Sequence, residues 1–318
     1  MDWKNDILGD GFEMTHVNQG NDYAGNVRCS VIRRKTAAKT TRGVLYIHGF
    51  SDYFFQKEMA MEYVDHGYDF YAVDLRRYGR SLQEGDKMFR VKSLREYFAD
   101  IQAGVDIMKA DDITEIILIG HSTGGLSTSL YMMEAPDPAI KGLILNSPFL
   151  TWNLSPAAIK LGIPVLKRIA RFHPKFRVKG DGTNKYAATL ARHLGGEWVY
   201  NTNWKPDIMP DVDAEWIKAI DDAQQGLKQG EIKVPVLFLH SDKSAKAGDS
   251  TEEYKTSDAV LNVKTMAATG RKLGKNVTEV IIPNGLHDLV LSKPSVRKSV
   301  FTAIFNWLDK TFPSPKAK

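Results

Sequence analysis

The clearest chemical signal in the sequence is a serine enclosed by glycines, Gly120-His121-Ser122-Thr123-Gly124. It follows the apolar stretch EIILI and precedes a helical pattern, which predicts a sharp turn from a strand into a helix. Such a turn strains the backbone at the serine, so the residues two positions away must be small, as Gly120 and Gly124 are. The helix N-terminus beside the hydroxyl stabilises developing negative charge. The pattern predicts that Ser122 is a nucleophile.

A serine hydroxyl needs a base to take its proton at neutral pH, and the chain has eight histidines. His287 lies just past the last predicted strand, in the turn Pro283–Asp288. His48 and His121 also lie near the predicted reaction centre, but their turns favour roles in holding the backbone. His240 ends a predicted strand, where a packed and hydrogen-bonded histidine is the usual case. We therefore expect His287 to be the base.

A carboxylate must accept the second ring proton of the base, to hold its tautomer and stabilise its charged form. The expected place is the loop that follows the strand Val234–His240. Asp242 lies close to that strand, and Asp258 precedes His287 by enough chain for one helix, one strand and one turn. The other acids of the loop are Asp249, Glu252 and Glu253.

Other chemistries lack their sequence patterns. We find no glycine-rich phosphate loop, no dinucleotide-binding turn and no paired-histidine zinc motif. The one cysteine, Cys29, excludes an internal disulfide and a cysteine-based metal site. The sequence therefore predicts neither a cofactor nor a bound metal.

Length and composition describe an ordinary globular protein. Its 318 residues are 43% hydrophobic and 25% charged, and no apolar run approaches the roughly 18 residues of a membrane-spanning helix. The first residues are acidic where a secretory signal has positive charge. Together with the single cysteine, these features lead us to expect a cytoplasmic location.

The excess positive charge is concentrated in one segment. The net charge is +5, and Lys160–Lys179 holds seven lysines and arginines and no acid. We find no aromatic platform or reading motif beside it, so we expect no nucleic-acid partner. A solvated helix face is one interpretation, and contact with anionic lipid headgroups or an anionic substrate is the other. Nothing in the sequence indicates the oligomeric state.

Short apolar strands alternate with helical patterns along most of the chain, which predicts an α/β fold: a mostly parallel sheet covered by helices on both faces. One such helix is Ser93–Ala110, which begins with a capping box. Near the N-terminus, Phe12–Asn18 and Asn26–Arg33 favour an antiparallel edge hairpin. The strands that we predict in the sheet are Gly43–Gly49, Tyr68–Leu75, Glu115–Gly120, Ile140–Asn146, Val234–His240 and Val277–Ile282.

The alternation breaks once, in a stretch rich in prolines and tryptophans with no evident buried strand. We predict that residues 149–230 form an inserted, mainly helical cap, and that residues 1–148 and 231–318 form the core domain. One stripe of the cap repeats at helical spacing, with a kink expected at Pro164. Its apolar residues are Ile159, Ile163, Leu166, Ile169 and Phe172.

With these motifs the chain resembles the α/β-hydrolase superfamily, especially its monoacylglycerol lipase and lysophospholipase-like branch, over about Gly43–Pro148 and Val234–Leu308. The resemblance implies that His48-Gly49-Phe50 carries one half of an oxyanion hole, and that the backbone amides of Phe50 and Thr123 are its donors. The turn Asp74–Ser81 is similar to a family motif, except that Arg77 replaces a usual glycine.

The resemblance also favours Asp258 as the acid. This residue begins Asp-Ala-Val-Leu-Asn-Val, which matches the family's D-x-V-x-x-V, whereas the family's usual spacing would fall on Ser244. We therefore interpret Lys243–Ser257 as an insertion, and Asp242 becomes the second choice.

The function implied is a serine hydrolase that cleaves carboxylic esters through an acyl-enzyme, with a small-molecule or lipid ester as substrate. An aminopeptidase, another amidase or a small-ester deacetylase on the same fold is the nearest alternative. A non-catalytic binding protein is the alternative of another class, and it predicts a broken triad. Through its cations, the cap is a candidate for transient contact with a membrane surface.

Overall fold

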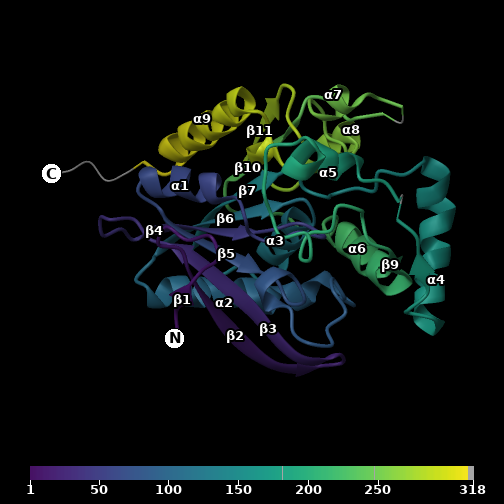
Figure 1. Ribbon diagram of the computed structural model, residues 1–318, viewed down its shortest axis with the longest axis horizontal. Coiled ribbons are helices and arrows are strands. Elements are labelled where there is room, and N and C mark those ends of the chain that lie inside the picture. Colours follow the sequence, from purple (N-terminus) through teal and green to yellow (C-terminus); the bar gives the residue numbers. More distant parts are fainter. Residues whose placement is uncertain (181, 247, 314–318) are drawn as a thin grey trace.

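The computed structural model describes residues 1–180, 182–246 and 248–313. Within them, nine strands form one sheet in the order β1-β2-β3-β5-β4-β6-β7-β10-β11 (Figure 1). All neighbours from β5 to β11 pair in parallel. The strands are β1 Lys4–Asn5, β2 Glu13–Asp22, β3 Gly25–Arg34, β4 Arg42–Ile47, β5 Asp69–Asp74, β6 Glu115–His121, β7 Ile140–Asn146, β10 Val236–Ser241 and β11 Val277–Ile282.

The central strands are buried on both faces because their side chains alternate between two hydrophobic cores. In β4, for example, Leu45 joins the core under α2, α3 and α8, and Tyr46 joins the core under α1 and α9. The predicted mostly parallel α/β sheet is confirmed. The helices around it are α1 Lys57–Asp65, α2 Tyr97–Ala110, α3 Thr123–Glu134, α8 Val263–Gly270 and α9 Pro294–Thr311.

The N-terminal hairpin lies at one edge of the sheet, as predicted, and both strands are longer than the sequence pattern indicated. β2 and β3 pair antiparallel, and β3 also pairs antiparallel with β5. The hairpin projects beyond the neighbouring strands (Figure 1). Its outer half lacks the apolar alternation that sequence patterns detect, because little of that half is buried.

Residues 149–230 pass over the carboxyl ends of the parallel strands and are mainly helical. Helix α4 lies at the edge of the molecule opposite α1 and α9 (Figure 1). The segment contains α4 Ile163–Phe172, α5 Lys185–Leu190, α6 Ala214–Gly226 and the two-residue strands β8 Arg177–Val178 and β9 Val212–Asp213. The remaining short helix, α7 Thr251–Tyr254, lies outside it.

The predicted apolar stripe of this segment is only partly buried. A π-helical turn, Ala158–Gly162, precedes α4, and Pro164 lies in the first turn of α4, where the missing N–H costs nothing. Ile163 is buried, but Phe172 is 73% exposed at the helix end, contrary to the shared face that we expected.

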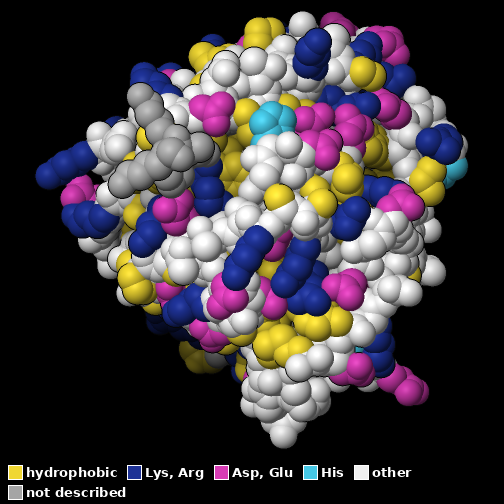
Figure 2. All heavy atoms as spheres, turned by 90° about the vertical axis from the view of Figure 1, so that its left-hand side faces the viewer, with side chains coloured by type: hydrophobic (Ala, Val, Ile, Leu, Met, Phe, Trp, Pro, Cys, Tyr) yellow, Lys and Arg dark blue, Asp and Glu magenta, His cyan; other side chains and the backbone are white. Residues whose placement is uncertain are grey.

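The face of the molecule on the side of α1 and α9 is shown in Figure 2. Positive and negative side chains alternate there, with hydrophobic ones scattered between them (Figure 2). Among the described residues, no helix has the length and apolar character needed to cross a membrane.

Candidate active site

Ser122 lies in a strained turn between β6 and α3, as the glycine pattern predicted. Its backbone has φ of 52°, in the left-handed region that non-glycine residues rarely adopt. A Cβ atom at Gly124 would lie 2.3 Å from the His48 carbonyl oxygen, and one at Gly120 would lie 2.7 Å from the Gly125 Cα. Both positions therefore require glycine, and the tight packing lifts the Ser122 side chain above the sheet edge.

Ser122, His287 and Asp258 form one chain of hydrogen bonds in a buried setting. The Ser122 Oγ and His287 Nε2 atoms lie 3.0 Å apart, and His287 Nδ1 and Asp258 Oδ2 also lie 3.0 Å apart. The second carboxylate oxygen of Asp258 accepts the amides of Val260 and Leu261, at 2.8 Å each. Because Asp258 can only accept, the arrangement assigns the ring proton to Nδ1 and leaves Nε2 to accept the serine proton.

The segment after β10 explains how Asp258 comes to face His287. The chain leaves the sheet at Ser241, the end of β10, and after α7 it returns so that Asp258 pairs with Ser244 in an isolated parallel bridge. The Ala245 amide donates to the Asp258 carbonyl, and the Asp258 amide donates to the Lys243 carbonyl, at 2.8 and 2.9 Å. The chain between Ser244 and Asp258 forms a loop, and the return of this loop places the Asp258 carboxylate next to Ser244.

The other acids of this loop point elsewhere. Asp242 is exposed, and its carboxylate accepts the Asn284 amide at 2.8 Å. Asp249 caps its own turn by accepting the Lys246 amide. Glu252 and Glu253 are exposed on α7. Among the described residues, Asp258 is the acid that hydrogen-bonds to His287.

The two candidate oxyanion donors lie on either side of the serine. Thr123 is the first residue of α3, and Phe50 follows Gly49, where a Cβ would lie 3.0 Å from the Ser122 Cβ. Neither the Phe50 nor the Thr123 amide donates a hydrogen bond to another part of the described chain. The Phe50 ring packs on Trp216, with centroids 4.6 Å apart. Both amides are thus available to an oxygen held next to Ser122.

Arg77 keeps the turn that the family forms with glycine. Its φ of 63° is the conformation that glycine adopts freely, and its side chain is buried. The guanidinium donates to Asp22 on β2 at 2.6 Å, and this contact stabilises an otherwise strained backbone. The hairpin therefore supports the turn.

The remaining histidines near the sheet edge hold the backbone, as expected. His48 Nδ1 donates to the Gly49 carbonyl at 2.8 Å, and its Nε2 accepts the Leu75 amide at 3.0 Å. His240 contacts the Ser241 carbonyl and the Glu279 carboxylate. His121 Nδ1 donates to the Asn146 carbonyl at 3.1 Å.

A second polar network, which sequence reasoning missed, supports the loop of His287. Asp288 accepts hydrogen bonds from the side-chain amides of Asn146 and Gln56, at 2.7 and 3.1 Å. The Asn146 carbonyl also accepts the Ser122 amide at 3.1 Å. Asn146 thereby ties the serine turn to the histidine loop. Its position at the end of β7, beside the end of β6, is the sequence signal that could have identified it.

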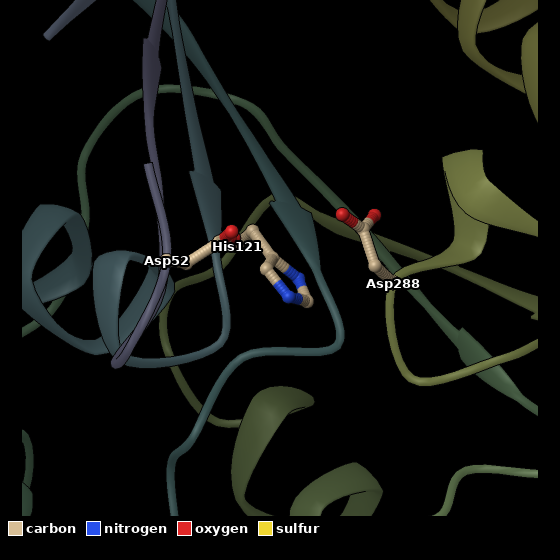
Figure 3. A group of neighbouring side chains, drawn as sticks. All are labelled: Asp52, His121 and Asp288. Carbon is tan, nitrogen blue, oxygen red and sulfur yellow. The ribbon is translucent and has the colours of Figure 1, made fainter. Parts of the chain in front are cut away.

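His121 lies between Asp288 and Asp52 (Figure 3), and the three ligand atoms are within 4.8 Å of one another. Such a group has the composition of a metal site, but both carboxylates already have partners. Asp288 accepts two amide donors, and Asp52 forms an ion pair with Lys205 at 3.0 Å. Burial lowers the pKa of the His121 imidazole, and the nearby Asp288 carboxylate opposes that shift. Both carboxylates are therefore already engaged by other side chains of this chain.

An apolar cavity of about 400 Å³ opens above Ser122. Its floor includes Ser122 and His287, and its walls come largely from residues 149–230. A smaller, more polar cavity of about 280 Å³ adjoins it and shares Tyr186 and Lys205. The apolar wall residues are Trp152, Leu154, Ile163, Leu166, Val178, Val212, Trp216 and Ile217.

Comparison with known proteins agrees with this geometry. The family model described as serine aminopeptidase, S33, matches residues 38–293. The chain belongs to this family. The resemblance to the α/β-hydrolase superfamily is thereby confirmed.

Two proteins and one solved structure illustrate the range of relatives. The chain is 30% identical to phospholipase YtpA of Bacillus subtilis over 108 residues, which are 34% of this chain and 40% of that protein. It is 27% identical to a non-heme chloroperoxidase of Burkholderia pyrrocinia over 72% of this chain and 78% of that one. A soluble variant of monoglyceride lipase from Saccharomyces cerevisiae, solved with a substrate analog, superimposes with a TM-score of 0.64. It is 18% identical, over 93% of this chain and 94% of the lipase, so it supports the fold alone.

Proposed function

We propose that this chain is a serine hydrolase that cleaves carboxylic esters. Ser122 is the nucleophile, His287 the general base and acid, and Asp258 the carboxylate that orients His287. The observation that carries the proposal is the chain of hydrogen bonds from Asp258 through His287 to Ser122, at the floor of an apolar cavity.

The reaction follows from the roles of these atoms. His287 Nε2 takes the Ser122 proton as Oγ attacks the ester carbonyl, and the amides of Phe50 and Thr123 hold the oxygen that becomes negative. The tetrahedral intermediate collapses, and His287 gives the proton to the departing alcohol. Water, deprotonated by the same nitrogen, then attacks the acyl-serine, and the carboxylic acid leaves.

The charged residues of the cavity favour an ester as the substrate over a peptide with a free N-terminus. An aminopeptidase needs a carboxylate to bind the substrate's α-ammonium group. Among the described residues that line the cavity, Asp52 is the one carboxylate, and the Lys205 ammonium already neutralises it. An ammonium substrate would have to displace Lys205 or leave a buried charge unpaired, which is costly.

The apolar wall favours a medium or long acyl chain. Burial of each CH₂ group contributes about 0.8 kcal/mol, so a chain that fills the space beside Leu166 and Trp216 gains affinity that acetate cannot. Monoacylglycerols and lysophospholipids have such chains, and the similarity to a phospholipase of Bacillus subtilis supports this substrate class.

We further propose that residues 149–230 act as a cap on a core formed by residues 1–148 and 231–318. The segment supplies most of the apolar wall over Ser122. Its outer surface combines exposed Leu161, Val165 and Phe172 with the cations Arg168 and Arg171. That combination is typical of a helix that lies on an anionic membrane surface, and we propose transient contact there. Cys29 is buried and forms no disulfide, which supports a cytoplasmic location.

A panel of substrates tests the proposal. We expect p-nitrophenyl esters to be hydrolysed, with kcat/KM rising from acetate toward octanoate, and aminoacyl p-nitroanilides to be inert. Preference for acetate would instead indicate a small-ester deacetylase. Cleavage of the anilides in preference to the esters would indicate an aminopeptidase.

A further inference from the structure

The loop that carries the Phe50 amide is held from two sides. On the core side, the Phe54 amide donates to Asp74 at 2.8 Å, and Arg80 donates to the Phe54 carbonyl at 3.0 Å. On the cap side, the Asn201 amide donates to the Tyr53 hydroxyl at 2.7 Å. The peptide group that joins Gly49 to Phe50 is held at its carbonyl by His48 Nδ1 at 2.8 Å, whereas the contacts with Asp74 and Arg80 begin only at Phe54, beyond Ser51 and Asp52.

Between Phe50 and Tyr53 the backbone is strained. Ser51 has φ of 51°, and its buried hydroxyl has no hydrogen-bond partner in the described chain. A non-glycine residue keeps this conformation only when its surroundings hold it there. The side chain that can do so is the next one, Asp52, because its carboxylate forms the ion pair with Lys205 at 3.0 Å.

Lys205 is unusually placed for a lysine. It is 7% exposed, belongs to residues 149–230, and lines both cavities at the site. Its ammonium lies 5.6–5.8 Å from the rings of Phe55, Tyr186 and Tyr200. Its ion pair with Asp52 therefore crosses from the cap segment to the loop of the oxyanion donor in a largely dry setting, where such pairs are strongly directional.

We propose that Lys205 is a positioning residue: through Asp52, it holds the Phe50 amide where the oxyanion forms. The inference rests on the proposed function, because it needs an oxyanion to stabilise. The activity of the site then depends on the position of the Asn201–Lys205 turn. If this part of the cap moved away, the Phe50 amide would no longer be held in the oxyanion hole.

The test compares variants that remove one or both charges. Lys205→Met and Asp52→Asn are each expected to lower kcat for p-nitrophenyl butyrate about 10- to 100-fold with KM changed less than about 3-fold. This loss is smaller than the 10²–10³-fold that removal of an oxyanion donor costs. The double variant should lose no more than the worse single variant, because both changes break the same pair. Lys205→Arg, which keeps the charge, should retain at least about a third of wild-type kcat.

The matched control is Lys87→Met. Lys87 also pairs across the boundary to the cap segment, with Asp213, and this ion pair lies near the Phe50 ring, but it does not involve Asp52 and its lysine is partly exposed. We expect its kcat to stay within about twofold of wild type. An equal loss in Lys87→Met would mean that any weakening of the cap has the same effect, and would overturn the proposal.

A boronic acid inhibitor gives a second readout, since its tetrahedral adduct with Ser122 places an oxygen in the same hole. The Lys205→Met variant should bind this inhibitor more weakly than wild type, by about the same factor by which its kcat/KM is reduced. Additive losses in the double variant, a Lys205→Arg variant as poor as Lys205→Met, or a change in KM alone would overturn the proposal. A wild-type protein that hydrolyses no ester would contradict the proposed function itself, a result distinct from these.

Discussion

Asp258 lies beside Ser244 in a parallel bridge, although a loop with its own short helix separates the two residues. The Ser244 hydroxyl donates to the Leu261 carbonyl at 2.8 Å and accepts the Val263 amide at 2.9 Å, so it fastens the segment that follows Asp258. The place at which the family's usual spacing would put an acid is thus occupied by a residue that positions the acid.

The first prediction follows from that relationship. Asp258→Asn should lower kcat by about 10⁴, because the amide no longer holds His287 in the productive tautomer. Asp242→Asn is the matched control, since its carboxylate contacts a backbone amide in the same region without reaching His287. Ester hydrolysis by the two variants provides the measurement. Normal activity in Asp258→Asn with loss in Asp242→Asn would reverse our assignment of the acid.

The second prediction concerns the acyl cavity. Leu166 lines it, whereas the adjacent Val165 is exposed on the outer side of α4. Leu166→Trp should fill part of the cavity and shift the preferred p-nitrophenyl ester to a chain shorter by several carbons, with at least a tenfold loss for decanoate. Val165→Trp adds the same side chain outside the cavity and should leave the chain-length profile unchanged. Identical profiles for both variants would exclude this cavity as the acyl site.

The third prediction concerns stability toward acid. Burial lowers the pKa of His121 below its ordinary value of 6.5, so the unfolded chain binds a proton more readily than the folded one just below pH 6.5. Stability therefore falls as the pH drops from 6.5 toward the folded pKa, by up to about 1.4 kcal/mol per pH unit. In His121→Gln, the free energy of unfolding should change less steeply with pH over this range. Urea unfolding between pH 8 and pH 5 provides the measurement. An unchanged slope would show that other groups cause the loss.

The fourth prediction concerns the outer surface of the cap segment. Arg168→Gln with Arg171→Gln should weaken sedimentation with phosphatidylglycerol-containing vesicles several-fold, and low salt should enlarge the difference. Lys298→Gln with Lys310→Gln removes two exposed cations from α9 and serves as the control. Equal weakening in both double variants would mean that net charge alone drives binding. Absence of binding by the wild-type chain would refute membrane contact.

Sequence reasoning succeeded where the signal is local. The small residues around Ser122 indicate the tight turn, although Gly124 is required by the close approach of the distant His48 carbonyl, and the buried strands are recognisable as apolar runs. Position along the chain alone did not separate Asp258 from Asp242, because no pattern within the loop shows that the chain returns to Ser244; the match to D-x-V-x-x-V favoured Asp258. It missed the ion pair between Asp52 and Lys205, which are 153 residues apart and meet only when the cap segment folds over the sheet.

The central claim is that Ser122 is an activated nucleophile, and labelling with a fluorophosphonate probe tests it most directly. The native protein should form one covalent adduct, located by peptide mass spectrometry at Ser122, and prior denaturation should abolish labelling because activation depends on His287 and the oxyanion donors. Ser122→Ala should remain unlabelled while its melting temperature stays near that of wild type. A folded native protein that forms no adduct at Ser122, or forms it elsewhere, would contradict the account.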